Sequence, residues 1–577
     1  MKAAGALCAG VLLACTASFM VAAQPYRTPE RPAAKTILDL QSYKHSSSLP
    51  IKNGRGRAGR ATLVEINPRI NAWYLLSLDW TAPVEHQTYH LENPNPRAQF
   101  LTLNAGGVAL SGNARNPDCA LWSSNAANPL EQARASALPY APLCESRLYL
   151  RNRVQGTQTQ IERATDFLRD HVWGGEQMVT FAKATIYKDA YLETAKPAAL
   201  AAPEVGPRPD APLPARLSAA MKGSAIVAEN LGLNVGSNKA ALAVGRWYSV
   251  HDSAGIFVSA MLPQAIAPEI FGQDQNLVNN LDAIEAAAVD YLVAFDLAKF
   301  ELGFALGTDH PRLDWSDRTL EQVRNAATPG PDGIGNAEPL VNNGMVSPAL
   351  LPRMAAAFTG GFKREHGAFH YGPLALRNAG SHYGFIDEGV VFSTLQPGLA
   401  TLYVLDDGTV GMKTWTASDN ALLPTIKYAR QNGVPLIEYD AASNTSIPGA
   451  LVTRWGPGNW GGDKNEKQRT LRAGACLLQT ASRRFLIYGY FSTATPSAMV
   501  RVFEAYGCHY AMHLDMNALE HTYLAVYTHR SGELLVQHLI DEMAVVDKKG
   551  GKQLAPRFLS FADDRDFFYL LHKEHPQ

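Results

Sequence analysis

The stretch RRFLIYGYFSTATPSAMVRVFEAYGCHYAMHLD, residues 483–515, decides the fold class. Its first part, 483–491, is rich in aromatic and aliphatic residues, as in a strand. Thr495 then stands where a helix N-cap is expected, Pro496 at the first helical position and Gly507 just past the helix end. The last eight residues again have strand character. The stretch therefore predicts strand, capped helix and strand, in a fold that combines sheets with helices.

Further strands are predicted on the N-terminal side of this unit. Residues 289–307 contain alternating strand material, and 400–415 hold two β runs around Asp-Asp-Gly, which is a strong hairpin signal. Residues 433–440 add another strand. We therefore predict a mixed α+β or α/β class. The C-terminal domain would have a mixed sheet with flanking helices, and the N-terminal domain would be rich in β-strands.

Length and charge narrow the class of protein. A chain of 577 residues is too long for one hydrophobic core, which favours two or three domains. The formal net charge is −1, so the chain has no basic field for nucleic acid and no polybasic anchor for an anionic membrane. Nucleic acid is therefore not an expected partner.

The N-terminus resembles an export signal. Residues 1–23 hold one early lysine, an apolar run and then small residues, which predicts a signal peptide cleaved after Ala23. The tetrapeptide Leu-Leu-Ala-Cys also fits a lipoprotein cleavage box that would leave Cys15 lipidated. No other apolar run approaches the length of a transmembrane span. We expect a periplasmic or secreted protein, with a lipoprotein as the open alternative.

Cysteine usage agrees with export. Four cysteines remain after removal of the signal, and an even number in an oxidising compartment predicts two disulfides. Proximity in the sequence favours pairing the first two and the last two, although three connectivities are possible. The four are Cys119, Cys144, Cys476 and Cys508.

A proline-rich segment divides the chain. Residues 195–217 contain six prolines and little that could pack, which predicts a semi-rigid linker. We therefore expect a β-rich domain of unknown role over 60–195 and a second domain over 218–577.

The C-terminal half resembles the phosphodiester glycosidase family, over about residues 285–577. The segment MAAAFTGGFKREHGAFHYG (354–372) is similar to a family segment that contains Ala-Ile-Asn-Gly-Gly-Phe. Residues 469–515 follow the family order of arginine, glycine, strand, helix, glycine, strand and Leu-Asp, and the 400–415 hairpin also has a counterpart. Members include the lysosomal uncovering enzyme, which removes N-acetylglucosamine from a sugar phosphodiester.

The chain departs from the family at two places. Thr359 stands where the family has asparagine before Gly-Gly. After Asp515 the chain has Met-Asn-Ala-Leu in place of Gly-Gly-Gly-Ser. Glycine permits positive φ and close approach of a ligand, which these replacements do not freely allow.

The resemblance and the residue types together suggest a site. Asp515 would be the carboxylate near the anomeric carbon, and Glu520 and His521 its acid/base partners. Cations after a Gly-Gly turn suit a phosphate, because backbone N–H groups and a guanidinium share its charge. The residues expected to bind substrate or phosphate are Thr359, Gly360, Gly361, Lys363, His366, Arg469, Arg472 and Asn517.

Two other arrangements remain open. A metal site could be built from histidines 509, 513 and 521 with Asp515, but no HExxH-type spacing is present, so we expect no metal or other cofactor. A second carboxylate for acid/base work could come from Asp387 and Glu388, or from Glu438 and Asp440.

The sequence thus predicts an exported hydrolase. Its substrate would be a glycosyl phosphodiester, or a related sugar linkage, of an envelope or extracellular polysaccharide. The alternative is a catalytically silent glycan-binding or envelope-assembly protein on the same fold.

Overall fold

The structure is a computed structural model of the 577-residue chain. It describes residues 36–53, 55–81, 83–112, 118–122, 128–172, 189–199, 202, 209–236, 239, 241–272, 276–367, 369, 371–377, 383–440, 442–460, 468–530, 532–550 and 553–574. The predicted signal peptide 1–23, and Cys15 within it, lie outside the described residues. The described chain consists of several sheets with a few short helices, which confirms the prediction of a β-rich α+β fold.

The N-terminal part is built from two antiparallel sheets. They enclose a core that includes Leu76, Leu91 and Trp122. Helix α1 (Pro129–Ala135) begins at Asn128, whose side chain accepts from the Leu130 amide. In sheet order, the larger sheet contains β1 (His45–Lys52), β2 (Ala58–Glu65), β3 (Trp73–Thr81), β4 (Val84–Glu92), β9 (Leu148–Arg151) and β8 (Tyr140–Leu143), and the smaller β5 (Phe100–Leu103), β6 (Gly107–Ser111) and β7 (Asp118–Ala120).

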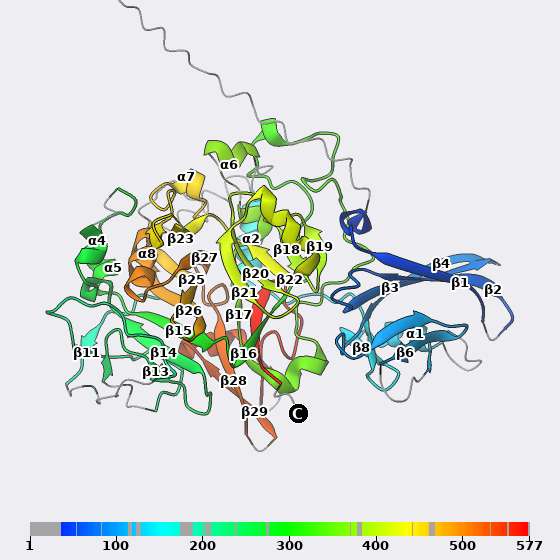
Figure 1. Ribbon diagram of the computed structural model, residues 1–577, viewed down its shortest axis with the longest axis horizontal. Coiled ribbons are helices and arrows are strands. Elements are labelled where there is room, and N and C mark those ends of the chain that lie inside the picture. The colour runs from blue at the N-terminus through cyan, green and yellow to red at the C-terminus, as the bar shows by residue number, and fades with distance from the viewer. Residues whose placement is uncertain are drawn as a thin grey trace, which may run out of the picture. The chain divides into compact units, whose positions relative to one another are not determined.

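An eight-stranded sheet carries the unit that decided the fold class. In sheet order it contains β13 (Tyr248–Ser249), β14 (Ile256–Met261), β15 (Asp290–Asp296), β26 (Arg484–Ala494), β25 (Thr470–Gln479), β27 (Tyr510–Met516), β23 (Pro435–Asp440) and β24 (Thr445–Pro448). Helix α8 (Pro496–Ala505) lies against this sheet (Figure 1). Its N-cap is Thr495, as predicted, and Gly507 follows its end with φ 77°. Both strands that α8 connects pair with β25.

Two five-stranded sheets complete the larger part. The first, in sheet order, contains β16 (Phe300–Ala305), β32 (Phe567–His572), β17 (Met354–Thr359), β28 (Leu524–Arg530) and β29 (Glu533–His538). The second contains β19 (Val390–Ser393), β18 (Phe385–Asp387), β22 (Ile426–Gln431), β20 (Ala400–Leu405) and β21 (Val410–Thr414). The β20–β21 pair confirms the predicted hairpin. All pairings between named strands of the described chain are antiparallel, and the sheets share one large apolar core.

Contacts across the predicted domain boundary are both apolar and polar, since Trp73 of β3 belongs to the large apolar core and packs against Phe392 with ring centroids 6.1 Å apart. Helix α2 (Gln160–His171) was expected in the N-terminal domain, yet Thr157, just before it, forms a β-bridge with Asp563. Part of the proline-rich segment, β10 (Lys196–Pro197), pairs with β11 (Ala225–Val227). The boundary at 195–217 stays a prediction. Of the helices that the structure describes, none has the length and apolar character needed to cross a membrane.

The predicted disulfides are both formed. Cys119 pairs with Cys144 and Cys476 with Cys508, at Cα–Cα distances of 5.6 and 5.9 Å. Each bridge joins cysteines that are neighbours in the sequence order, as proximity had suggested.

Candidate active site

Three strand ends meet at the candidate site. Thr359, the last residue of β17, pairs with Phe567, the first of β32. The Thr359 amide donates to the carbonyl of Tyr523, which lies just before β28 (3.1 Å), and the next amide, of Gly360, donates to the Asp566 carbonyl (2.9 Å). The end of β17, the start of β32 and the turn from β27 to β28 are therefore held together by backbone hydrogen bonds.

Asp515 lies next to the last residue of β27, with its carboxylate buried. One oxygen, Oδ1, accepts from the amide of the following Met516 at 2.8 Å. The other, Oδ2, accepts from Nη1 of Arg565 at 2.5 Å. A carboxylate in contact with a guanidinium and a backbone amide is fixed in position, as a catalytic carboxylate must be.

Arg565 is the centre of the cluster. Besides Asp515, its guanidinium contacts Glu162 through Nε (2.9 Å) and Nη2 (2.6 Å), and Nη2 also lies 2.8 Å from Nε2 of His521. The side chain is 3% exposed. Arginine suits such a position because its planar fork presents several N–H groups in fixed directions.

Lys363 joins the same cluster from the segment after Gly360 and Gly361. Its Nζ donates to Asp564 at 2.9 Å and lies 3.5 Å from Glu162. Burial would raise the pKa of Glu162, but the nearby charges of Arg565 and Lys363 outweigh burial, so the pKa lies below its usual range. Glu162 is thus a carboxylate at neutral pH, and the cluster is ionic.

His521 contacts the site through both ring nitrogens. Nδ1 lies 2.8 Å from the carbonyl oxygen of Met516, which only accepts, so Nδ1 carries a proton and donates. Nε2 faces two groups: Nη2 of Arg565 (2.8 Å), which only donates, and Oε1 of Glu162 (3.8 Å), which only accepts. The ring therefore presents Nε2 to the interior of the site, between a guanidinium and a carboxylate.

Glu520 reaches the site mainly through its backbone. Its carbonyl oxygen accepts from Oγ1 of Thr359 (3.1 Å) and from Nη1 of Arg557 (2.6 Å). Its carboxylate accepts from Oγ1 of Thr159, the residue before α2, at 3.1 Å. Thr359 thus uses its hydroxyl to hold the turn that carries Glu520 and His521.

The two predicted glycines allow buried polar groups to approach the backbone. A Cβ at Gly361, where φ is 141°, would collide with the Arg430 guanidinium, and one at Gly360 would lie 2.8 Å from the Asp566 carboxylate. Asn432 then ties this loop to β27. Its Oδ1 accepts from the Phe362 amide (3.1 Å), and its Nδ2 donates to the carbonyls of residues 513 and 514 (2.6 and 2.7 Å).

The turn after Asp515 contains one residue in the left-handed region. Asn517 has φ 80°, which asparagine tolerates better than most residues. Its side-chain oxygen accepts from Thr470 at 3.1 Å. Asn517 therefore shapes the turn, and its described hydrogen bond leads away from the Arg565 cluster.

The other predicted cations have different partners. Arg469 forms ion pairs with Asp189 (3.1 Å) and Asp282. Arg472 is fully buried and donates to the carbonyls of Ala494 (2.8 Å) and Trp460 (3.2 Å). Neither has a described ion pair with Asp515.

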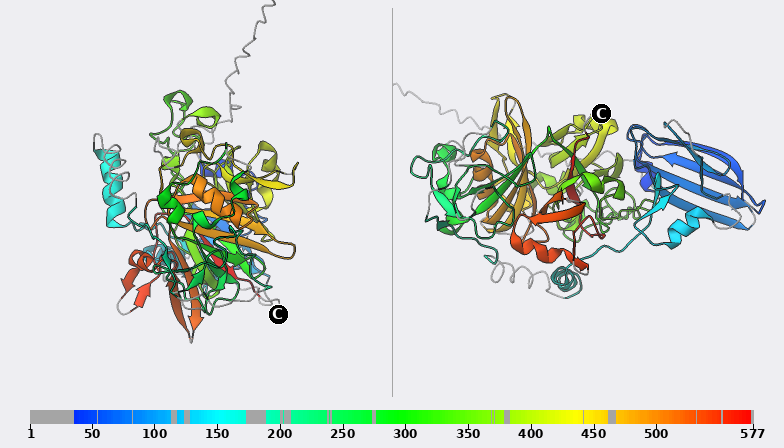
Figure 2. Two further views of the ribbon diagram at one scale, coloured as in Figure 1. Left: turned by 90° about the vertical axis from the view of Figure 1, so that its left-hand side faces the viewer. Right: turned by 90° about the horizontal axis from the view of Figure 1, so that it is seen from below.

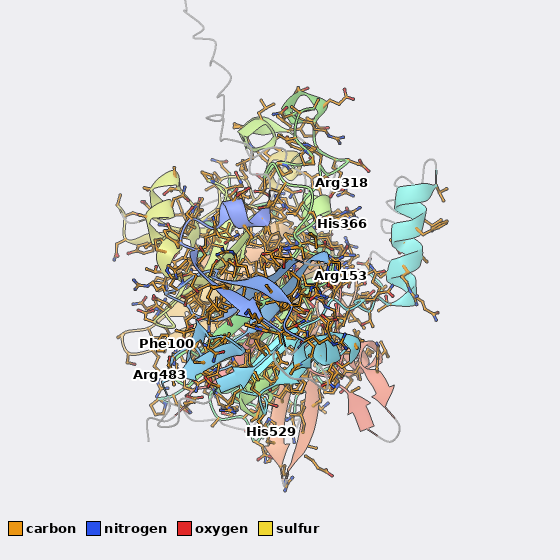
Figure 3. The ribbon with its side chains drawn as sticks, turned by 90° about the vertical axis from the view of Figure 1, so that its right-hand side faces the viewer. Phe100, Arg153, Arg318, His366, Arg483 and His529 are labelled. Carbon is orange, nitrogen blue, oxygen red and sulfur yellow. A yellow bond between two sulfur atoms is a disulfide. The ribbon has the colours of Figure 1, made fainter. Side chains whose placement is uncertain are left out.

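His366 also lies outside the cluster in the described contacts. It stands in the 3-10 turn Arg364–Gly367, where its carbonyl oxygen accepts from Nη1 of Arg318 at 3.1 Å. Figure 3 labels both residues, which lie close together. The role of His366 in substrate binding stays a prediction.

The histidines considered for a metal site have separate surroundings. His513 is fully buried; burial and the charge of Arg472, whose Nη1 lies 3.1 Å away, lower its pKa well below 6.5. The His509 ring lies against the Tyr439 ring at a tilt of 36°, with ring centroids 5.9 Å apart. Within the described chain, no three His, Cys, Asp or Glu side chains are grouped so as to hold a metal ion.

The two candidate acid pairs differ in burial. Asp387 is buried and accepts from the Leu306 amide at 3.1 Å; burial and the nearby Glu388 raise its pKa to about 8. Glu438 accepts from Thr414, and the exposed Asp440 accepts from Ser443 (2.6 Å). None of these has a described contact with Asp515.

Sequence reasoning missed the central members of the cluster. Arg565 belongs to the run Asp-Asp-Arg-Asp at 563–566, immediately before the apolar strand β32, and that adjacency was the available signal. Glu162 stands three residues after Thr159, which is the pattern of a capping box. The Glu162 amide does donate to Thr159 (3.1 Å), but its carboxylate turns to Arg565.

Comparison with known proteins gives little beyond this geometry. No family model matches the chain, and no curated protein matches it. The catalytic domain of zebrafish N-acetylglucosamine-1-phosphodiester alpha-N-acetylglucosaminidase aligns with 56% of this chain and 85% of its own length, at 9% identity and a TM-score of 0.29. A hypothetical protein from Synechocystis aligns with 94% of this chain and 100% of its own, at 9% identity and a TM-score of 0.26. The chain therefore has only weak structural similarity to a glycosidase catalytic domain.

Proposed function

We propose that the protein is an exported hydrolase that cleaves a glycosyl phosphodiester, or a related sugar linkage, of an envelope or extracellular polysaccharide. One observation carries the proposal: Arg565 brings Asp515, His521 and Glu162 to one buried cluster, and Glu162 links that cluster to Lys363. Such a cluster contains two carboxylates, an imidazole and two cations. These are the groups that cleavage of a sugar phosphate requires.

The proposed reaction uses these groups and needs no cofactor. Arg565 and Lys363 bind the phosphodiester anion, and Asp515 stabilises positive charge at the anomeric carbon. The water oxygen forms a bond to that carbon while the bond from the carbon to the phosphate oxygen breaks. Nε2 of His521 takes the proton of the water, and the phosphate monoester leaves with the bonding electrons. Glu520 is the second candidate for the acid/base role.

The test is the substitution Asp515→Asn. The purified protein is assayed on an aryl glycosyl phosphodiester, with release of the reducing sugar as the readout. Loss of the carboxylate charge should lower turnover by about a hundredfold or more, since transition-state electrostatics is usually a large term. Unchanged turnover would remove Asp515 from the mechanism.

Asp407→Asn is the matched control. Asp407 is exposed in the hairpin turn, where it accepts from the Thr409 amide (2.8 Å), so the same chemical change there should leave turnover unchanged. Equal losses in both variants would point to a general effect on folding.

A second candidate function is glycan binding without hydrolysis. The N-terminal sheets form an open pocket of about 400 Å³ between β1, β2 and β5. Its walls combine hydroxyl, imidazole, carboxyl and aromatic groups, which suits the mixed surface of a sugar. They include His45, Ser47, Glu65, Tyr74, Phe100 and Thr102. Oligosaccharide binding that is lost in Phe100→Ala, with no hydrolysis by the parent protein, would favour this function.

A further inference from the structure

Helix α2 sends one charged side chain into the protein. Among the α2 residues whose side chains the structure describes, Glu162 is buried, whereas Arg163, Phe167 and Leu168 are exposed, Phe167 to 61%. Figures 2 and 3 show this helix, in cyan, at the edge of the larger part. A helix on a protein surface normally buries an apolar stripe, whereas the buried side chain among those described in α2 is the Glu162 carboxylate.

One oxygen of that carboxylate receives all its described charged contacts. Oε1 of Glu162 accepts from Nε and Nη2 of Arg565 (2.9 and 2.6 Å) and lies 3.5 Å from Nζ of Lys363 and 3.8 Å from Nε2 of His521. These three are the groups that the proposed reaction uses to bind the anion and to move the proton. Glu162 therefore occupies the place where the substrate phosphate would make its contacts.

The charges in the cluster indicate that Glu162 takes the place of a monoanion. The buried cations Arg565 and Lys363 are paired with the carboxylates of Asp515 and Asp564, and Lys363 also lies 3.6 Å from the more exposed Asp309. Glu162 adds one further negative charge, which both cations share. A phosphodiester is a monoanion with accepting oxygens, so exchange of Glu162 for a phosphodiester leaves the net charge of the buried cluster unchanged. Exchange for a neutral group would leave the cations short of hydrogen-bond acceptors.

From these contacts we infer that Glu162 is an internal competitor of the substrate. Its carboxylate holds the anion-binding site closed, and a phosphodiester binds when α2 withdraws it. The inference rests on the proposed function for the identity of the substrate, but the anion site itself is defined by the contacts.

The ties that hold α2 in place are polar. Oγ1 of Thr159 donates to Glu520 (3.1 Å), Nε2 of Gln158 donates to Asp564 (2.7 Å), and Thr157 bridges Asp563. A hydrogen bond to a charged carboxylate contributes about 1.5–3 kcal/mol, and water can replace it on opening. The costlier tie is the buried pair of Glu162 with Arg565, and the entering phosphodiester takes the place of Glu162 as the partner of that guanidinium.

The test measures binding of dimethyl phosphate, a phosphodiester monoanion without a sugar, to the full chain by titration calorimetry. Glu162→Gln removes the competing charge and keeps the shape of the side chain. A group tethered at a site acts at an effective concentration of millimolar or above, so its removal should tighten binding by about tenfold or more. Equal or weaker binding in a folded Glu162→Gln protein overturns the inference.

Glu145→Gln is the matched control. The Glu145 side chain is 89% exposed, so this substitution makes the same chemical change outside the cluster. Its affinity for dimethyl phosphate should equal that of the parent chain. A gain in both variants would overturn the inference, because it would reflect net charge alone.

A second variant covers the case in which Glu162→Gln does not fold. Thr159→Val removes the N-cap of α2 and the bond to Glu520 without changing any charge in the cluster. It should tighten dimethyl phosphate binding in the same direction by a smaller factor, and no gain overturns the inference. Because dimethyl phosphate contains no sugar, tighter binding without sugar release would support the competitor and contradict the proposed hydrolase. Sugar release at the same rate in the parent chain and in Glu162→Gln would support the proposed hydrolase and contradict the competitor.

Discussion

Arg565 and Glu162 form a buried ion pair although 403 positions separate them in the sequence. Both Nε and Nη2 of the guanidinium point at one carboxylate oxygen. The pair connects the helix that follows the N-terminal sheets with the segment that precedes the C-terminal strand β32. A contact of this kind fixes the path of the chain, because a buried charge without its partner is costly.

Arg565→Lys should therefore destabilise the protein. Lysine keeps the positive charge, but a single ammonium group cannot donate to Asp515, Glu162 and His521 at once, as the guanidinium does. We expect the free energy of unfolding in urea to fall by about 3 kcal/mol, near the cost of breaking a buried pair. Arg60→Lys, on the exposed side of β2, is the control and should change it by less than about 0.5 kcal/mol. Equal stability of the two variants would contradict a structural role for Arg565.

The buried Asp387 predicts a dependence of stability on pH. Its pKa is raised from 3.8 to about 8, mainly by burial, so between these values the folded protein holds a proton that the unfolded chain has lost. The contribution of Asp387 to stability is therefore greatest below about pH 4 and falls as the pH rises to about 8. The slope is at most about 1.4 kcal/mol per pH unit.

Asp387→Asn isolates this contribution. The amide keeps an acceptor for the Leu306 amide but cannot ionise. The free energy of unfolding is measured in urea at pH 5, 6, 7 and 8. The difference between the variant and the parent chain should shift in favour of the variant by about 1 kcal/mol per pH unit as the pH rises. Parallel stability curves would show that Asp387 ionises normally.

The local features of the fold could be predicted from the sequence, whereas its central contacts could not. The cap at Thr495, the hairpin turn at Asp406–Gly408 and both disulfides follow from patterns within a few tens of residues. Arg565 and Glu162 required knowledge of how distant segments meet. Four charged residues in a row are typical of a solvated surface, and Thr159 with Glu162 is typical of a capping box, so local rules favoured other roles for both.

Asp515 was predicted at the end of a strand that follows a helix. It lies next to the last residue of β27, as that pattern predicts, while its role as the catalytic carboxylate stays a prediction. Arg469 and Arg472 were both predicted to bind the substrate anion. The pairing of β25 with β26 shifts register between Thr470 and Arg472, so the side chains in this stretch do not alternate regularly between the two faces of the sheet. A bulge of this kind changes which face a side chain occupies, and nothing in the sequence marks it.

Gly361→Ala tests the packing of the Gly-Gly turn. The added Cβ meets the Arg430 guanidinium, which is fully buried and paired with Asp566 (2.6 Å), so the guanidinium cannot move without loss of that pair. The positive φ adds strain. We expect a loss of about 3 kcal/mol or more in the free energy of unfolding. Gly408→Ala is the control: its φ is +85°, with no atom within 4 Å of the added Cβ, so it should cost only about 1 kcal/mol. Similar losses would show that backbone strain alone accounts for the effect.

The two disulfides should act on different parts of the protein. Cys119 and Cys144 belong to the small apolar cluster of the N-terminal sheets, whereas Cys476 and Cys508 belong to the large cluster that surrounds the candidate site. Replacing either pair by serine opens a loop of 25 or 32 residues, and each should lower stability by about 3 kcal/mol.

Only the second pair borders β27, the strand of Asp515, since Cys508 lies two residues before it. Dimethyl phosphate binding below the melting temperature should therefore weaken in the Cys476→Ser/Cys508→Ser protein and stay unchanged in the Cys119→Ser/Cys144→Ser protein. The opposite order would mean that the anion site depends on the N-terminal sheets.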